Sequence, residues 1–205
     1  MKNYLHNNFS LAIEPNRIVA VVGDPNVLTA PTNQWKQKTG MIFSSPTLFP
    51  NMTIFRNVLA GYTFNHIRLS KAEQQIIVEE SLREADLWDQ TKDYLNKKQH
   101  ILSPVQQQQL CLARALALRP KLLLMDNPTA TLDRAATEIF EELILRLKTK
   151  YTILIVPQSL AQAARIADEV MYIDDGLLIE CSESRSFFLR PKDKRTEQFL
   201  NEQLA

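Results

Sequence analysis

The chain has 205 residues, 45% of them hydrophobic, which is enough for one substantial core. Lys plus Arg number 24 and Asp plus Glu 23, so the net charge of +1 argues against nucleic acid or an anionic membrane as the main partner. No stretch approaches the roughly 18 apolar residues of a membrane span, and the N-terminus lacks the apolar run of a signal peptide. We therefore expect a soluble, cytoplasmic protein.

The two cysteines, Cys111 and Cys181, both lie in apolar stretches and are far apart in the sequence. We expect a pair of reduced thiols in or near the core, rather than a disulfide or a metal site.

Short apolar runs alternate with segments of helical pattern along the chain. The runs that predict buried strands cover residues 17–22, 121–126 and 151–156. The helical patterns cover residues of about 104–118, 134–148 and 160–167. This alternation predicts an α/β fold, with a parallel sheet that carries helices on its faces.

Residues of about 69–100 are charged and have a helical pattern, which predicts a small helical lobe beside the sheet. The apolar residues expected to form its buried stripe are Ile76, Ile77, Leu82, Ala85 and Leu87. Further on, residues 174–176 (Asp-Asp-Gly) lie between two apolar triplets and predict a hairpin turn. Residues 191–205 predict a surface helix.

Several segments, in order, resemble the motifs of ATP-binding-cassette (ABC) ATPases. Residues 102–108 and 113–117 resemble the signature segment, 122–126 the Walker B strand, 128–133 the loop after it, and 39–50 the Q-loop region. Two further segments, 85–93 and 190–197, are similar to the helical lobe and the C-terminal tail of phosphate-importer ATPases.

The resemblance implies a P-loop NTPase-like fold, with a mostly parallel sheet flanked by helices and a small helical subdomain. We expect a single domain over residues 1–205, with the subdomain at about 63–118 and the N-terminal part truncated relative to the family. Between the phosphate loop and residue 38, the family has a full helix and several antiparallel strands that this chain lacks.

Active members of the family need a glycine-rich loop after the first strand, because backbone N–H groups, a lysine and a hydroxyl bind the phosphates and magnesium there. Here only Gly23 remains of the glycines. Thr29 stands at the lysine position and Ala30 at the position of the magnesium-binding hydroxyl. The resemblance therefore implies a degenerate phosphate-binding loop.

The other positions of the family's nucleotide site are altered in the same direction. Ser44 stands at the Q-loop glutamine position, Asn127 at the catalytic glutamate and Gln158 at the switch histidine. An amide cannot act as a general base near neutral pH. In the signature segment between Ser103 and Gln106, Pro-Val replaces Gly-Gly, although the same four residues form a good capping box with proline at the first helical position.

Two aspartates of the family pattern are retained. Asp126 matches the residue that holds magnesium through water, and Asp133 matches one that helps to build the dimer interface. The alternatives are a polar residue at a strand end for Asp126 and a helix N-cap for Asp133, and we favour these structural roles. The pattern of residues 43–62 is better kept, and it indicates either a groove for a membrane subunit or packing between the sheet and the lobe.

From these residues we expect a degenerate, non-catalytic ATP-binding subunit of a phosphate-type ABC importer that acts as a docking or regulatory partner. Its partners would be a membrane permease subunit, an intact ATPase subunit or a second copy of itself, at the inner face of the cell membrane, without nucleic acid and without insertion into the bilayer. No cofactor is expected, whereas ATP and Mg²⁺ would bind if the family's function survives. The alternatives are an active ATPase coupled to phosphate import and a decayed paralogue without function.

Overall fold

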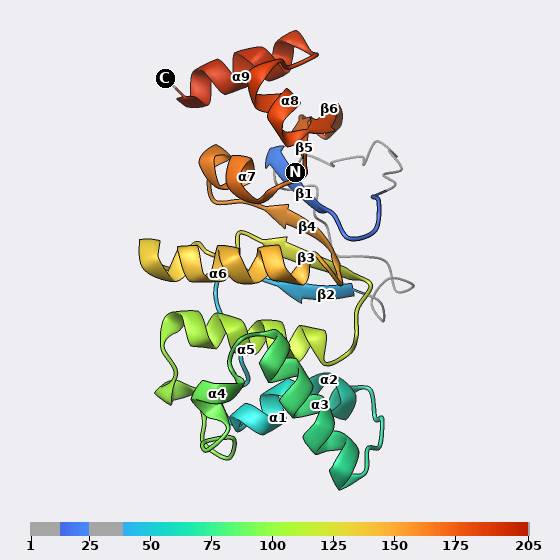
Figure 1. Cartoon of the computed structure of the whole chain (residues 1–205), viewed down its shortest axis with the longest axis vertical. Coiled ribbons are helices and arrows are strands. Elements are labelled where there is room, and N and C mark those ends of the chain that lie inside the picture. The colour runs from blue at the N-terminus through green and yellow to red at the C-terminus, as the bar shows by residue number, and fades with distance from the viewer. Residues whose placement is uncertain (1–12, 25–38, 205) are drawn as a thin grey trace, which may run out of the picture.

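The computed structural model describes residues 13–24 and 39–204. Within these residues six strands form one sheet in the order β2-β3-β4-β1-β5-β6 (Figure 1). The strands are β1 (Ile18–Gly23), β2 (Thr39–Ile42), β3 (Leu122–Asp126), β4 (Thr152–Val156), β5 (Glu169–Asp174) and β6 (Leu177–Glu183). All neighbours are parallel except β5 and β6, which form the hairpin predicted at residues 174–176. The predicted α/β class with a mostly parallel sheet is confirmed.

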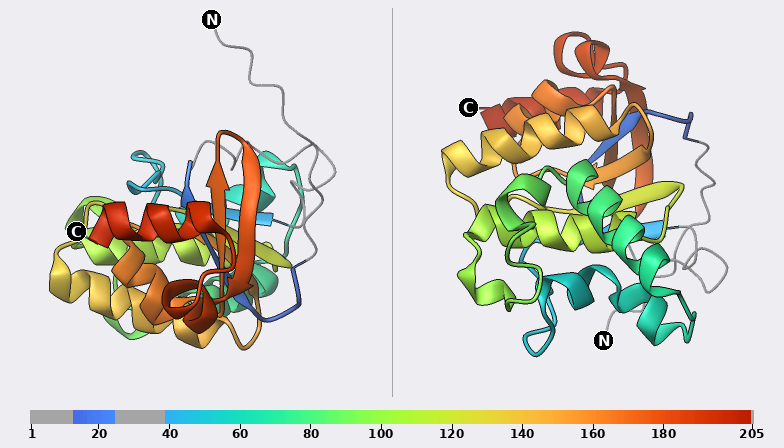
Figure 2. Two further views of the ribbon diagram at one scale, coloured as in Figure 1. Left: turned by 90° about the horizontal axis from the view of Figure 1, so that it is seen from above. Right: turned by 60° about the horizontal axis from the view of Figure 1, so that its bottom comes forward.

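The helices fall into three groups. Near one end of the molecule lie α1 (Ile54–Val58), α2 (Ala60–Phe64), α3 (Lys71–Glu84), α4 (Trp88–Thr91) and a 3₁₀ turn, η2 (Gln99–Ile101). Along the sheet lie α5 (Pro104–Leu116), α6 (Arg134–Leu147) and α7 (Leu160–Ile166), and the C-terminal end carries α8 (Ser184–Leu189) and α9 (Lys194–Leu204). Figures 1 and 2 show α1–α4 and α8–α9 at opposite ends, with the sheet between them. No helix in the described ranges has the length and hydropathy of a bilayer span.

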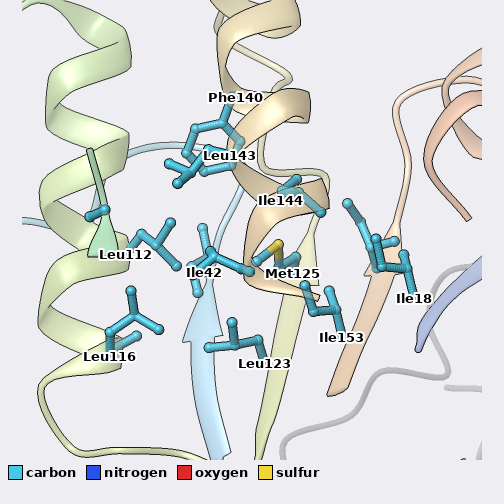
Figure 3. Close-up of a cluster of buried hydrophobic side chains, with 14 of the residues drawn as sticks. Ile18, Ile42, Leu112, Leu116, Leu123, Met125, Phe140, Leu143, Ile144 and Ile153 are labelled. Atoms are coloured by element: carbon cyan, nitrogen blue, oxygen red, sulfur yellow. The ribbon is translucent and has the colours of Figure 1, made fainter. Parts of the chain in front are cut away.

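The main core forms where one face of the sheet meets α5 and α6 (Figure 3). Apolar side chains from four strands interlock there with side chains from the two helices. These residues are Ile18, Ile42, Leu123, Met125 and Ile153 of the strands and Leu112, Leu116, Phe140, Leu143 and Ile144 of the helices, all at most 2% exposed. Complete burial of one such side chain stabilises the fold by about 1.5–3 kcal/mol, so this layer fixes the strand ends relative to α5.

The helical lobe is confirmed, but its buried stripe differs from the prediction. Leu82, Ala85 and Leu87 are fully buried, whereas Ile76 is 55% exposed and Val78 is buried instead. Val78, Leu82 and Ala85 are spaced by four and three residues and share one helix face, while position 76 is rotated by about 200° from position 78. Between α4 and the 3₁₀ turn η2 the chain forms turns, so the helical pattern predicted for residues of about 69–100 is helical over only part of its length.

Two predictions at the surface have different outcomes. Residues 194–204 form α9, which confirms the C-terminal helix. Cys111 is a buried free thiol as expected, but the prediction for Cys181 is wrong because this free cysteine is exposed. In the antiparallel strand β6 successive side chains alternate between faces, so the buried Glu180 and Ser182 leave Cys181 facing outward.

Candidate functional site

The residues assigned to the nucleotide site gather at one edge of the sheet. Because β2, β3, β4 and β1 are parallel, their carboxyl ends meet at the same edge. Gly23 ends β1 and Asp126 ends β3, whereas Ser44 follows β2, Asn127 follows β3 and Gln158 follows β4. Thr29 and Ala30 lie outside the described residues.

Gly23 is required by the packing at the end of β1. Its φ is +94°, and an added Cβ would lie 2.1 Å from the carbonyl oxygen of Ile173 and 2.7 Å from the ring of Tyr172. The next residue, Asp24, donates its backbone N–H to the carbonyl of Ile173 at 2.9 Å. The surviving glycine of the loop therefore has a structural reason to be glycine that is independent of any phosphate.

Asp126 and Asn127 differ in how they are held at the end of β3. Asp126 is exposed. Asn127 has a φ of +47°, which asparagine tolerates better than most residues, and its backbone N–H donates to the carbonyl of Val156 at 2.9 Å. Its Oδ1 atom is buried and has no hydrogen-bond partner among the described residues. The residue that we predicted at the catalytic glutamate position is thus an amide with a buried side-chain oxygen that is unpaired among the described residues.

The loop after β3 leads directly into α6. The Oδ1 atom of Asp133 accepts the backbone N–H of Ala136 at 2.8 Å, so Asp133 is the N-cap of α6, as the structural alternative predicted. On the neighbouring loop, the backbone oxygen of Ser44 is 3.5 Å from the hydroxyl of Thr131. The family roles of Asp133 and Ser44 stay predictions.

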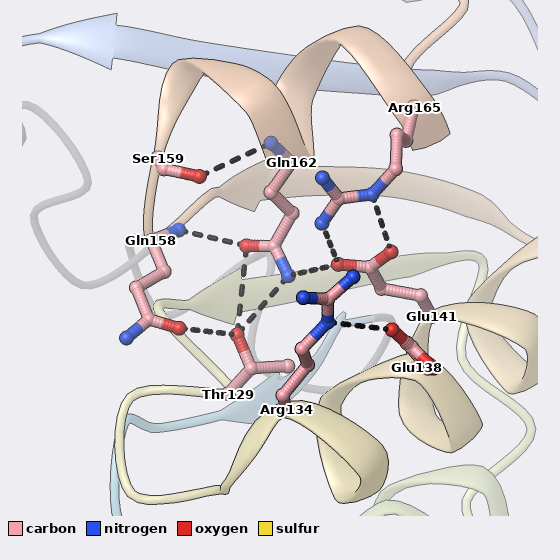
Figure 4. A network of polar contacts seen from close by, with 8 residues as sticks. All are labelled: Thr129, Arg134, Glu138, Glu141, Gln158, Ser159, Gln162 and Arg165. Carbon is pink, nitrogen blue, oxygen red and sulfur yellow. Dashed lines mark hydrogen bonds and ion pairs between the residues drawn. The ribbon is translucent and has the colours of Figure 1, made fainter.

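Gln158, at the switch position, belongs to a polar cluster at the ends of β3 and β4 (Figure 4). Its backbone N–H donates to Oε1 of Gln162 at 2.7 Å, and Nε2 of Gln162 donates to Glu141 at 2.9 Å. Arg165 holds Glu141 with two hydrogen bonds of 3.0 and 2.6 Å, and Thr129 completes the cluster. We missed these partners from the sequence; the available signal was polar residues on the inward face of two amphipathic helices.

The pKa of Glu141 lies below its ordinary value of 4.5. Burial by itself raises it, but the hydrogen bonds from Arg165 and Gln162 and the charge of Arg165 outweigh that effect. Arg165 is held in the charged form by the same contact, so the cluster contains a stable ion pair.

The N-terminus of α5 is closed by its own side chains, which confirms the predicted capping box. The hydroxyl of Ser103 accepts the backbone N–H of Gln106, and the side chain of Gln106 accepts the backbone N–H of Ser103. Pro104 has no N–H to offer. A signature segment would direct backbone N–H groups at a phosphate. In this chain the N–H group is absent at Pro104, and those of Ser103 and Gln106 are bonded within the cap, which leaves that of Val105.

Gln108, one turn further along α5, connects the helix to two loops of the site. Its Nε2 atom donates to the carbonyls of Phe43 at 2.7 Å and Pro128 at 2.9 Å, and the residue is only 1% exposed. No feature of the sequence other than its position in the glutamine run indicated this role. Gln108 therefore fixes the segments after β2 and β3 relative to the helical lobe.

The segment between β2 and α2 is built around a second buried amide. Asn57 is completely buried; its Oδ1 accepts the backbone N–H of Phe49, and its Nδ2 donates to the carbonyls of Phe49, Met52 and Thr53. Arg114 binds the backbone oxygen and the hydroxyl of Thr47 and lies over the ring of Phe49. These contacts hold residues 43–67, which we call the platform. Three of its apolar side chains face solvent, since Phe43, Phe64 and Ile67 are 39%, 55% and 50% exposed.

The described residues do not fit the Mg²⁺-bound nucleotide that the resemblance implies. Within the described ranges no group of three His, Cys, Asp or Glu side chains is placed to hold a metal ion. Asp126 is followed by an amide instead of a second carboxylate, and the N-terminus of α5 is capped by its own residues. No chemical step is therefore derived through that group.

Comparison with known proteins agrees with the fold and the motifs. The model of the ABC transporter family matches residues 24–130, just over half of the chain. The phosphate import ATP-binding protein PstB of Malacoplasma penetrans (strain HF-2) is 48% identical over 164 residues, which cover 80% of this chain and 56% of that protein. This chain thus spans little more than half the length of that relative.

Among solved structures, CbiO1 from Clostridium perfringens, described as part of the ABC transporter complex CbiONQ, superimposes with a TM-score of 0.75. The match covers 95% of this chain and 86% of that one at 19% sequence identity, so it supports the fold alone. The family match, the ordered motifs and the fold agree, and the chain belongs to the ABC transporter family of ATP-binding proteins.

Proposed function

We propose that this protein is an ATP-binding-type subunit of a phosphate-type ABC importer that docks to its partners without hydrolysing ATP. The 48% identity to a phosphate import ATP-binding protein supports the transporter class. The observation that carries the non-catalytic part is the N-terminus of α5, where Ser103 and Gln106 satisfy each other and proline removes a donor.

Two further features support the loss of hydrolysis. Asn127 cannot take a proton from water near neutral pH, and its buried Oδ1 points away from solvent. Gln158 is tied by its backbone to Gln162, and its side chain carries no titratable group.

The platform around Asn57 supports a docking role. A membrane subunit needs a rigid surface with apolar side chains, and Phe43, Phe64 and Ile67 provide such side chains on a segment held by buried hydrogen bonds. Among the described residues, positions 43–67 contain no buried side-chain polar atom without a hydrogen-bond partner, unlike Asn127. We therefore assign the partner-binding role of the subunit to residues 43–67.

Calorimetry with Mg-ATP, combined with a phosphate-release assay on the same sample, tests the catalytic part. The Malacoplasma penetrans relative serves as the positive control. We expect no heat of binding up to millimolar nucleotide and no phosphate release from this chain. Micromolar binding with turnover would overturn the proposal and establish an active ATPase.

Capture by the membrane subunits of a phosphate-type importer in detergent tests the docking part. Phe64→Glu places a charge on the proposed surface and should reduce capture at least tenfold. Ile139→Glu is the matched control, because Ile139 is 48% exposed on α6, away from that surface. Equal capture of both variants, or no capture of the unmodified chain, would contradict docking and favour a decayed paralogue.

A further inference from the structure

In the cluster at the ends of β3 and β4, the side chain of Gln162 bonds to three other residues (Figure 4). Gln162 is 1% exposed and lies on α7, between the loop after β3, the loop after β4 and α6. Its Oε1 accepts the backbone N–H of Gln158 at 2.7 Å, while its Nε2 donates to the hydroxyl of Thr129 at 3.1 Å and to Glu141 at 2.9 Å. One amide thus spans three segments that are distant in the sequence.

The orientation of this amide is imposed by its neighbours. An ionised carboxylate can only accept hydrogen bonds, so the NH₂ group of Gln162 must face Glu141. The opposite end of the amide must then present its oxygen, and the backbone N–H of Gln158 is the donor that it meets. Arg165, with two hydrogen bonds to Glu141, keeps the carboxylate ionised and in place.

We propose that Gln162 is a positioning residue that latches the loop after β4 to the loop after β3, and that the Glu141–Arg165 ion pair sets the direction of the latch. Both loops carry positions assigned to the family's chemistry, Asn127 and Gln158. All hydrogen bonds of the latch are made between described residues of this chain.

The cluster also defines how the latch is released. Thr129 is fully buried and Glu141 is 6% exposed, but the side chain of Arg165 is 54% exposed. An anion that draws Arg165 away, or a proton on Glu141, removes the constraint on the Gln162 amide. The other charged groups near Glu141 are Glu138 and Arg134 on α6, which form their own exposed ion pair.

Hydrogen exchange of the Gln158 backbone amide, measured by NMR, tests the latch. The protection of this amide is compared with that of Ile155, a buried β4 residue that reports global unfolding. Gln162→Leu keeps the approximate volume but removes the hydrogen bonds of the side chain to Gln158, Thr129 and Glu141, and we expect the Gln158-to-Ile155 protection ratio to fall at least tenfold. Glu142→Gln, at the exposed neighbour of Glu141, should leave the ratio unchanged.

A charge exchange provides the decisive control. Gln162→Glu alone places two carboxylates together and should lower the ratio. Adding Glu141→Gln restores a donor opposite the new carboxylate, so the double variant E141Q/Q162E should recover most of the protection. A role in packing alone would not produce this rescue.

Three outcomes would overturn the proposal: an unchanged ratio in Gln162→Leu, a lack of rescue in the double variant, or an equal fall in Glu142→Gln. Acid provides an independent readout. The ratio in the unmodified protein should decline as the pH falls below 4.5 and Glu141 is protonated, whereas in Glu141→Gln it should not vary with pH. A ratio that responds to acid equally in both proteins would also contradict the latch.

Discussion

Asn57 lies within α1 and Asn127 directly follows β3, and the side-chain amides of these two asparagines have different surroundings. Asn57 in the helical lobe is completely buried, and both ends of its amide are bonded to backbone groups. Asn127 at the end of β3 has a positive φ and a buried Oδ1 without a partner among the described residues. The lobe thus uses its amide to organise a surface, whereas the strand end carries an amide that contributes little to the fold.

The difference indicates which buried amide side chains stabilise the fold. Buried polar groups are normally hydrogen-bonded, because an unpaired one costs about 1–3 kcal/mol. Asn57 and Gln162 follow that rule at both ends of their amides. Gln108 is bonded through Nε2, but its buried Oε1, like the Oδ1 of Asn127, has no partner among the described residues. Because the buried oxygen of Asn127 forms no such bond, we expect replacement of this side chain to cost little folding free energy.

The largest effect should come from removing the lobe's amide. Asn57→Ala leaves one buried N–H and three carbonyls without this partner, and we expect the free energy of unfolding to fall by about 3 kcal/mol. Urea denaturation measures the change. Asn51→Ala, at an exposed asparagine of the same loop, is the control and should change stability by less than about 0.5 kcal/mol. A loss below about 1 kcal/mol for Asn57→Ala would show that the hydrogen bonds of this amide contribute little to stability.

A smaller effect is expected at Glu180, a buried carboxylate on β6 that accepts the backbone N–H groups of Lys192 and Asp193 and the hydroxyl of Ser182. Burial raises its pKa, but these hydrogen bonds outweigh burial, and the pKa lies below 4.5. Glu180→Gln should cost about 1–2 kcal/mol at pH 7.

The sign of the pH effect follows from the lowered pKa of Glu180. A carboxylate with a lowered pKa stabilises the fold above its unfolded value and loses that contribution as the pH falls through the folded value. The stability difference between Glu180→Gln and the unmodified protein should therefore shrink below pH 4.5. Glu183→Gln, at an exposed glutamate of the same strand, is the control. A difference that stays constant down to pH 3 would show that the ionised form is not what holds the start of α9.

At Asn127 the backbone conformation should matter more than the side chain. Asn127→Gly accepts the positive φ and removes the buried unpaired oxygen, so stability should stay equal or rise by as much as about 0.5 kcal/mol. Asn127→Ala should be less stable than the glycine variant by about 1 kcal/mol, because the Cβ atom of alanine disfavours the left-handed conformation. Thermal unfolding of the pair decides this, and equal stabilities would show that the φ value is not a constraint.

The smallest effect is expected at Asp126. This exposed carboxylate at the end of β3 should be replaceable by Asn with a change of less than about 0.5 kcal/mol in the free energy of unfolding. If Mg²⁺ raises the melting temperature of the unmodified protein but not that of Asp126→Asn, the family's metal role survives at this residue. That outcome would contradict the purely structural role that we assign to Asp126 at the end of β3.

Much of the fold could be predicted from the sequence because local rules and tertiary packing agree in it. The apolar runs at β1, β3 and β4 and the caps of α5 and α6 are encoded within a few residues, and the structure confirms them. The wrong assignment of Ile76 came from treating neighbouring apolar residues as one stripe without following the helical rotation. Cys181 was misjudged because apolar neighbours in a strand alternate between faces.

The polar contacts of the site could not be predicted to the same extent. Gln108 and Gln162 each bridge segments separated by at least 20 residues, and a glutamine in a helical pattern does not show whether it faces solvent or a buried carbonyl. Only the strand order brings Phe43, Pro128 and Glu141 within reach of these amides. The departures from the family motifs were predicted from the sequence alone, whereas the partners that hold the neighbouring loops required the structure.

The position of β1 in the sheet has a consequence for biosynthesis. Ile18 pairs with Ile153 and Val19 with Glu169, so β1, the first of the described strands, must wait for partners that are synthesised more than 130 residues later. At about 5–20 residues per second, that interval lasts on the order of ten seconds. During this time the β-branched segment Ile18–Gly23 has no neighbour on either side. Binding of nascent β1 by a chaperone, and release once residue 174 has emerged, would be the expected course of folding in the cell.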